Sequence, residues 1–154
     1  MKNIYGKELV FPEDVYYSEE LLWVKDLGGN KVRLGICDLA VKSVKNIVYV
    51  KISSRIGDKV TKGESVGHVE TTKGVWDIII PLSGTVVEVN GPIAKGNANP
   101  IVAEPYGNGW LVELETAGDA ASELKALLKG SDAETKKWIL EKAEELVPLM
   151  EEDE

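Results

Sequence analysis

Three side chains stand out for the chemistry they could do: the only cysteine, Cys37, the only histidine, His68, and Lys73 in a predicted turn. A single cysteine allows no internal disulfide and no cysteine cluster for zinc. A single histidine makes a histidine-based metal site or a Ser-His-Asp triad difficult to assemble. We therefore expect neither a metal site nor a catalytic residue, which leaves Lys73 as the main candidate.

Lys73 lies at the centre of a predicted β-hairpin. Residues 64–70 are typical of a strand, residues 71–74 of a turn, and residues 75–80 of a strongly apolar strand. A tight turn projects its side chains clear of the sheet, where a modifying enzyme can reach an ε-amine. A lysine in a turn is ordinarily only a solvated residue, so the position alone does not establish a function.

The elements that must position this hairpin are mostly strands. Between residues 22 and 115, short alternating apolar segments are separated by Gly, Asn, Asp and Pro, a pattern typical of an antiparallel sandwich or barrel. Two segments show one apolar face each: Val32, Leu34 and Ile36 in the first, and Val48, Val50 and Ile52 in the second. The sequence therefore predicts a mainly β fold.

The last forty or so residues change to helical patterns. Asp119 is placed to cap a helix that carries Leu124, Leu127 and Leu128 and ends at Gly130.

A second helix is predicted to follow. Ser131 with Glu134 forms a capping-box pattern, and Pro148 is expected to end the helix. Apolar residues recur between them at helical spacing, namely Ile139, Ala143 and Leu146.

The length of 154 residues and the 44% hydrophobic content fit a single domain. We divide it into a β domain with an N-terminal extension (1–118), helices packed on the same domain (119–148) and an acidic tail (149–154) that is expected to fray into solvent.

The net charge of −8 and the pI near 4.8 disfavour nucleic acid and anionic membranes as partners, and could steer the chain toward basic protein surfaces. No apolar run approaches the ~20 residues that span a bilayer, and the N-terminus lacks the pattern of a secretory signal. We therefore expect a cytoplasmic protein.

The segment 63–84 resembles the modification hairpin of lipoyl-bearing proteins. In those proteins a glutamate precedes the modified lysine by three residues, and glycines lie sixteen residues before and eleven after it. Glu70, Gly57 and Gly84 stand at these spacings from Lys73. The resemblance implies covalent lipoate on Lys73, with the other three residues in recognition. Biotin carriers typically flank their lysine with methionines, which are absent here, so biotin is the weaker interpretation.

A lipoyl group would turn Lys73 into a long arm. Amide formation removes the lysine charge, and the arm ends in a five-membered cyclic disulfide. Ring closure holds the C–S–S–C dihedral well below its preferred value, so the disulfide opens readily to a nucleophile.

The flanking segments resemble the glycine cleavage system H protein family. The matching segments are FPED (11–14), YSEE (17–20), WV (23–24), VRLGICDLA (32–40) and EPYGNGWL (104–111). This resemblance implies a barrel-sandwich hybrid with C-terminal helices, and a non-catalytic carrier that moves an aminomethyl group on its lipoyl arm.

The same resemblance implies the partners. They are a lipoate ligase or lipoyl synthase, a pyridoxal-phosphate glycine decarboxylase, a folate-dependent aminomethyltransferase and a flavin dihydrolipoyl dehydrogenase.

The sequence departs from the family near the expected arm. Leu21 and Leu22 replace the usual histidine and glutamate, and Trp76 follows Lys73 closely. These three residues and His68 are candidates for a cleft that holds the arm or for partner contacts. An apolar cleft keeps open a divergent lipoate-binding carrier in sulfur oxidation with a heterodisulfide-reductase-like complex. A second alternative, from another class, is an unmodified structural subunit that has kept the fold.

The remaining candidates have structural interpretations. Cys37 ends an apolar strand and is expected to be a small core residue. Trp23 and Trp110 are expected in the core, while Trp76 and Trp138 are better candidates for contact surfaces.

Overall fold

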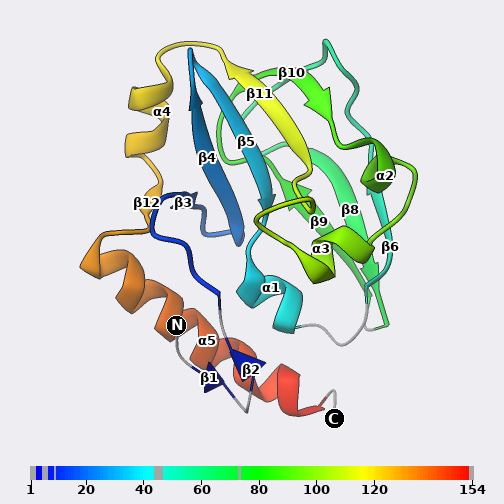
Figure 1. The fold of residues 1–154 in the computed structure, drawn as a ribbon, viewed down its shortest axis with the longest axis vertical. Coiled ribbons are helices and arrows are strands. Elements are labelled where there is room, and N and C mark those ends of the chain that lie inside the picture. Colours follow the sequence, from blue (N-terminus) through cyan, green and yellow to red (C-terminus); the bar gives the residue numbers. More distant parts are fainter. Residues whose placement is uncertain (1–2, 5–6, 9, 44–46, 73, 153–154) are drawn as a thin grey trace.

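The computed structural model describes the backbone of residues 3–4, 7–8, 10–43, 47–72 and 74–152, and within these the side chains of 10–43, 47–72 and 74–146. Antiparallel sheets make up most of the regular structure, and a long helix lies at the C-terminal end (Figure 1). The predicted mainly β class is therefore confirmed.

A seven-stranded antiparallel sheet forms one side of the fold, in the order β12-β3-β4-β5-β11-β10-β7. Its strands are β3 (Tyr16–Tyr17), β4 (Leu22–Gly28), β5 (Lys31–Ile36), β7 (Lys59–Val60), β10 (Gly84–Val89), β11 (Val112–Thr116) and β12 (Leu128–Lys129).

A three-stranded antiparallel sheet, in the order β6-β8-β9, carries the predicted hairpin. Its strands are β6 (Ile47–Ile52), β8 (Ser65–Thr71) and β9 (Gly74–Ile79). A separate pair, β1 (Asn3–Ile4) and β2 (Lys7–Glu8), lies near the N-terminus. The β8–β9 hairpin matches the sequence prediction to within a residue at each strand end.

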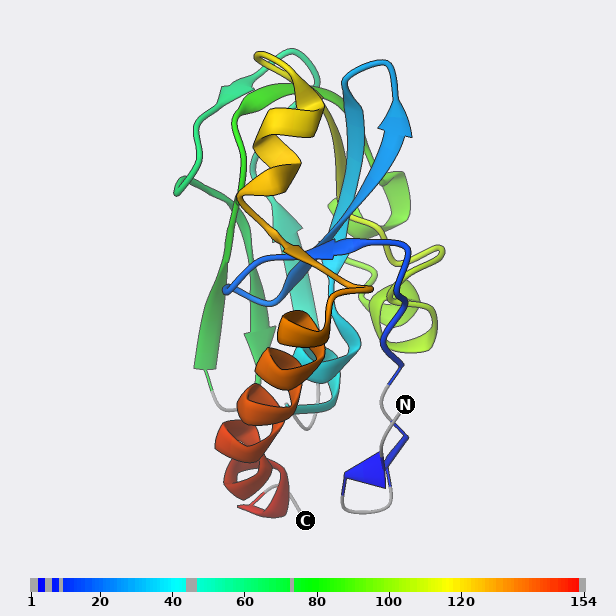
Figure 2. The ribbon, with the colours of Figure 1, turned by 90° about the vertical axis from the view of Figure 1, so that its left-hand side faces the viewer.

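Five helices connect or cover these strands in the described part of the chain: α1 (Asp38–Ser43), α2 (Gly91–Ala94), α3 (Asn99–Ala103), α4 (Ala120–Lys125) and α5 (Ala133–Glu152). Helix α5 packs against α1 and runs past the end of the molecule where the β8–β9 hairpin closes (Figures 1 and 2). None of the described helices is long and apolar enough to cross a membrane.

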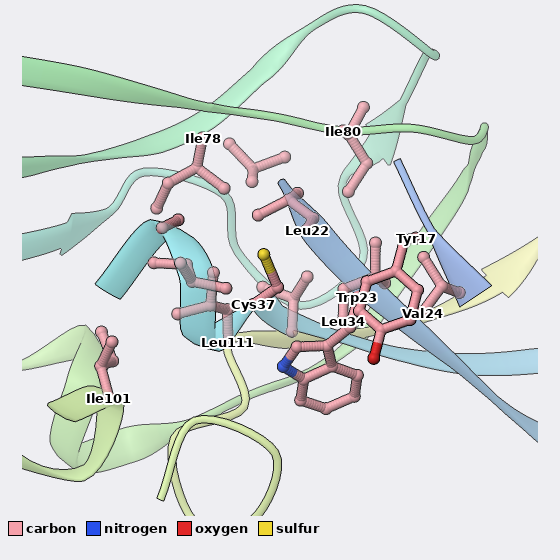
Figure 3. Close-up of a cluster of buried hydrophobic side chains, with 14 of the residues drawn as sticks. Tyr17, Leu22, Trp23, Val24, Leu34, Cys37, Ile78, Ile80, Ile101 and Leu111 are labelled. Atoms are coloured by element: carbon pink, nitrogen blue, oxygen red, sulfur yellow. The ribbon is translucent and has the colours of Figure 1, made fainter. Parts of the chain in front are cut away.

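One cluster of buried side chains joins the two sheets. Leu22 and Leu34 contribute from the seven-stranded sheet, and Ile78 from the three-stranded sheet (Figure 3). Val69 of the three-stranded sheet belongs to the same cluster. Burying each such side chain contributes roughly 1.5–3 kcal/mol. The shared core therefore holds the hairpin sheet in place against its partner.

Trp23 lies fully inside this core and fixes the β4–β5 packing. Its indole Nε1 donates a hydrogen bond to the Pro105 carbonyl oxygen at 2.8 Å, so the polar end of the ring is satisfied. Gly35, the register partner of Trp23, leaves room for the ring, because a Cβ built there would lie 2.5 Å from the indole.

Helix α1 is tied to distant segments through Asp38. The buried Asp38 carboxylate accepts hydrogen bonds from the Val10 N–H, at 2.8 Å, and from Lys42 Nζ. The Asp38 N–H donates to the Tyr106 hydroxyl oxygen at 3.0 Å. These contacts fix α1, which supplies part of the candidate site.

The predicted alternation of β6 holds for Val50 and Ile52 but is wrong for Val48, which is 62% exposed. The register with β8 shifts between Ile47 and Tyr49, the mark of a β-bulge. A bulge inserts one extra residue, so the inward and outward positions change places beyond it.

The predicted helix after Asp119 begins as expected but ends early. The Asp119 carboxylate accepts a hydrogen bond from the Ala121 N–H at 3.1 Å, and α4 ends at Lys125. Leu127 and Leu128 were therefore wrongly placed in it. Leu128 instead pairs with Tyr17, so pairing with a distant strand replaces the last helical turn.

Both predicted limits of the second helix are wrong. The helix begins at Ala133, so Asp132 rather than Ser131 stands at the N-cap position. It also continues through Pro148 to Glu152, inside the range assigned to the acidic tail. Proline removes one N–H donor and disfavours the helical conformation in the residue before it. A proline therefore makes it less favourable for a helix to continue, but it does not prevent this. Residues 153 and 154 lie outside the described residues.

Cys37 lies in the core, 1% exposed (Figure 3), as predicted. Burial in apolar surroundings raises the pKa of its thiol to about 12. The thiolate is the reactive form, so neither access nor ionisation favours reaction.

We predict that Ellman's reagent at pH 8 leaves Cys37 unmodified in the folded protein and modifies it fully in denaturant. Rapid modification in the absence of denaturant would show that the thiol is open to solvent.

Replacing Gly35 by alanine should force a methyl group against the Trp23 ring. We expect Gly35→Ala to lower the free energy of unfolding by about 1–3 kcal/mol, measured by urea denaturation. Gly118→Ala is the matched control, because a Cβ there meets nothing within 4 Å. Equal losses in the two variants would contradict this account of the packing.

Candidate functional site

The β8–β9 ladder ends next to the predicted attachment residue. Thr71 and Gly74 are register partners at the end of the β8–β9 ladder, which leaves residues 72 and 73 between the strands. Gly74 has a φ of 145°, a conformation that side-chain-bearing residues rarely adopt, and its carbonyl oxygen accepts a hydrogen bond from Thr71 Oγ1 at 3.1 Å. Lys73 itself lies outside the described residues.

The outer face of the hairpin sheet carries the predicted recognition residue Glu70. Tyr49, Glu70 and Val75 pair across the three strands, and all three side chains are at least partly exposed. Residue pairs in register point to the same side of a sheet. A carboxylate close to the hairpin tip is therefore presented to solvent between two apolar neighbours.

His68 lies on this same outer face, two residues from Glu70. Its Nε2 is 3.5 Å from the Glu70 Oε2, and its register partners are Lys51 and Asp77. His68 therefore lies among charged groups on the surface.

Trp76 points to the opposite, inner face, because it pairs with the buried Val69. There its half-buried ring lines a pocket of about 250 Å³. The other lining residues come from three further parts of the chain: Leu21, Ala40, Ser43 and Leu146.

Two of the four predicted cleft or contact residues thus meet in one pocket, and two do not. Leu21 and Trp76 line it together. His68 lies across the sheet, and Leu22 is 1% exposed in the core, where it pairs with Ile36. Leu22 begins β4 and is buried in the core, whereas Leu21 precedes the strand, so the two leucines do not reach the same cleft.

Leu21 reaches the pocket from an unusual backbone conformation, with a φ of 67°. Its N–H donates to the Ser18 carbonyl oxygen at 3.0 Å, and its own carbonyl oxygen accepts from the Cys37 N–H at 2.9 Å. A non-glycine residue in this region costs of order 1–3 kcal/mol and persists only where its surroundings hold it. Two backbone hydrogen bonds hold Leu21 at the pocket wall.

Gly57 and Gly84 lie beyond the base of the hairpin, away from its tip. Gly57 has a φ of 95°, and its N–H donates to the Val86 carbonyl oxygen at 2.7 Å. A Cβ on Gly84 would lie 2.5 Å from the Glu115 carbonyl oxygen. Both glycines thus allow turns and close strand packing, and Gly84 also borders a separate surface hollow of about 460 Å³.

Sequence reasoning missed three residues of the Trp76 pocket: Ala40, Ser43 and Leu146. The helical spacing of Ile139, Ala143 and Leu146 was a usable signal, since it marked the face of α5 that packs inward. Ile139 and Ala143 are indeed buried, and Leu146 is partly buried at the pocket. The spacing did not show which surface this face would cover.

The three tryptophans outside the pocket differ in how deeply they are buried. Trp23 is buried as predicted, whereas Trp110 is only partly buried and has the Arg33 guanidinium carbon 5.0 Å from its ring centre. Trp138 packs partly buried on the core side of α5.

Three proteins that are similar to this chain have the same description. A glycine cleavage system H protein of Mycolicibacterium gilvum (strain PYR-GCK) is 42% identical over 123 residues, covering 80% of this chain and 91% of that protein. One of Mycolicibacterium vanbaalenii is 43% identical over 105 residues, covering 68% and 79%. The crystal structure of a glycine cleavage system H protein from Mycobacterium marinum is similar with a TM-score of 0.67 at 34% identity, covering 82% of this chain and 97% of that chain.

The sequence model of the family described as Glycine cleavage H-protein matches residues 15–142. The match includes both large sheets and the first half of α5, and it stops before Leu146. It spans most of the chain, and the curated relatives agree with it. This chain belongs to the glycine cleavage H-protein family.

Proposed function

We propose that this chain is a lipoylated carrier of glycine cleavage, with lipoate bound in amide linkage to Lys73. The observation that supports the proposal is the β8–β9 hairpin, whose ladder ends in a tight turn at the pairing of Thr71 with Gly74. Such a turn gives a modifying enzyme access to a lysine from several directions. Membership of the H-protein family supports lipoate as the group attached.

A lipoyl group on Lys73 would supply a strained cyclic disulfide, which can accept the aminomethyl group of glycine. The protein is a non-catalytic carrier, and its residues present and shelter the arm. The apolar pocket at Trp76 lies on the inner face of the hairpin that bears Lys73 and has room for a small uncharged group, so the residues present fit a lipoyl ring.

The proposed partners follow from this role. A lipoate ligase or lipoyl synthase modifies Lys73, and glycine decarboxylase, aminomethyltransferase and dihydrolipoyl dehydrogenase then use the arm in turn. The net charge of −8 favours partners with basic docking surfaces. We place these encounters in the cytoplasm.

The two alternatives from the sequence gain no support. The curated relatives reported above are named glycine cleavage system H proteins, which favours glycine over a sulfur cargo. Glu70 is partly exposed beside the hairpin tip, where a modifying enzyme can contact its carboxylate. An unmodified structural subunit does not need a carboxylate at this position.

Glu70 is the proposed recognition residue for the modifying enzyme, because its carboxylate lies on the outer face next to the tip. We expect protein from a lipoylation-competent host to carry one lipoyl group by intact mass, and Lys73→Arg to carry none. Glu70→Ala should slow lipoylation at least about tenfold, which corresponds to about 1.4 kcal/mol. The free energy of unfolding should change by no more than about 0.5 kcal/mol, since the Glu70 side chain is partly exposed on the sheet surface.

Glu64→Ala is the matched control, an exposed carboxylate at the base of the same hairpin. Equal rates of lipoylation in the Glu70 and Glu64 variants would remove Glu70 from recognition. An unmodified wild-type chain in a competent host would favour the structural-subunit alternative.

A role in glycine cleavage can be tested separately on the lipoylated protein. With an active glycine decarboxylase, it should support exchange of labelled bicarbonate into the carboxyl group of glycine, and Lys73→Arg should abolish the exchange. Lipoylated chain that gives no exchange would argue against an aminomethyl cargo.

A further inference from the structure

Large apolar side chains are exposed on the three-stranded sheet, near the end where the β8–β9 ladder closes. Val48 and Tyr49 on β6 are 62% and 40% exposed, and Val75 on β9 is 66% exposed. Single exposed apolar residues are ordinary, whereas several of them on one surface mark a contact site. Val69 and Ile78 commit the inner face of this sheet to the core, so the outer face is the one left for a partner.

Tyr49, Glu70 and Val75 form one row across the outer face, because Glu70 is the register partner of both other residues. Neighbouring strands lie about 4.8 Å apart, so the row spans roughly 10 Å. The next register pair along the hairpin, Thr71 with Gly74, already ends the ladder. The row therefore presents a carboxylate between an aromatic and an aliphatic side chain, next to the end of the hairpin.

The Tyr49 ring is held in position by the segment that follows helix α2. Helix α2 packs against β6 (Figure 1), and Gly96, two residues after this helix, has a φ of 100°. A Cβ on Gly96 would lie 2.6 Å from the Tyr49 ring, so the ring rests on the glycine backbone. A side chain that is already held loses little conformational entropy when a partner binds. Tyr49 is therefore suited to anchor a contact, as tyrosines at interfaces often do.

The length of a lysine side chain limits which partner can use this row. An enzyme that modifies the ε-amine of Lys73 must approach to within a four-carbon stem of the backbone, so it also covers the residues beside the end of the hairpin. Enzymes that act on the sulfur end of a lipoyl arm work at a greater distance from the hairpin. The Glu70 carboxylate favours a basic group on the partner, and Tyr49 and Val75 favour apolar groups around it.

Resting on the proposed lipoylation of Lys73, we propose that Tyr49, Glu70 and Val75 together form the docking surface for the enzyme that attaches lipoate, with Val48 at its margin. The enzyme pairs a lysine or arginine side chain with Glu70 and covers Tyr49 and Val75 with apolar groups. Recognition thus extends from β8 to both neighbouring strands. A surface of this size suits a transient encounter between an enzyme and its protein substrate.

The first test measures kcat and KM for lipoylation of the full-length chain by a lipoate ligase supplied with lipoate and ATP. Tyr49→Ala should raise KM at least about tenfold, which corresponds to about 1.4 kcal/mol, and leave kcat within about twofold, because the ring only binds the enzyme. Tyr49→Phe keeps the ring and should keep the wild-type KM. Leu27→Ala, at a 39% exposed position at the end of β4, is the matched control and should also keep it.

The second test concerns charge at Val75, on the edge strand β9, and does not depend on the packing of Tyr49 against Gly96. Val75→Lys places a cation beside Glu70 and repels a basic partner, so KM should rise about tenfold at low salt, whereas Val75→Glu should raise it no more than about threefold. High salt should reduce the difference, because it screens exposed charges.

The outcomes separate this proposal from the carrier role. A wild-type KM for Tyr49→Ala, or equal KM values for Val75→Lys and Val75→Glu, would overturn the docking surface and leave lipoylation of Lys73 intact. A Tyr49→Ala chain that is lipoylated normally but loses glycine–bicarbonate exchange would assign the row to the decarboxylase, which also overturns the proposal. A wild-type chain that takes no lipoyl group in a competent host overturns both.

Discussion

The register of the β8–β9 hairpin determines to which face each hairpin side chain of the candidate site points. Val69 and Trp76 face inward together, while Glu70 and Val75 face outward together. A slip of one residue would exchange these faces, which would bury Glu70 and expose Val69. Burial of Val69 and Ile78 in the shared core prevents such a slip, so the core also fixes which residues occupy the turn.

The hairpin could be predicted from the sequence because its determinants are local. The apolar strand before Pro81 and the glycine at 74 mark its limits without reference to the rest of the chain. The wrong predictions concern residues whose structure depends on contacts with distant segments of the chain. Leu128 leaves a helical pattern to pair with Tyr17, and the bulge at Val48 depends on the alignment of β6 with β8. Alternation and helical spacing do not report such contacts.

The candidate site likewise has a part that follows from local sequence and a part that depends on contacts between distant segments. Glu70 and Trp76 could be assigned to opposite faces by counting residues from the turn, because a strand alternates. The pocket could not be derived in this way, since Leu21 and Leu146 are far apart in sequence and meet only through the packing of α5 on α1. The positive φ of Leu21 likewise depends on its hydrogen bonds with Ser18 and Cys37. Leu22, its neighbour, belongs to the core and not to the site.

Under the proposed function, the β8–β9 hairpin presents Lys73 for lipoylation. The apolar pocket at Trp76 lies on the inner face of the same hairpin. The measurement that most directly tests the central claim is the mass of the proteolytic peptide containing Lys73, after the lipoylated protein has been incubated with glycine and glycine decarboxylase. We predict a glycine-dependent mass gain on that peptide equal to glycine minus CO₂, which is one aminomethyl group plus the hydrogen of the new thiol. A lipoylated peptide that shows no such gain with an active decarboxylase would contradict the claim.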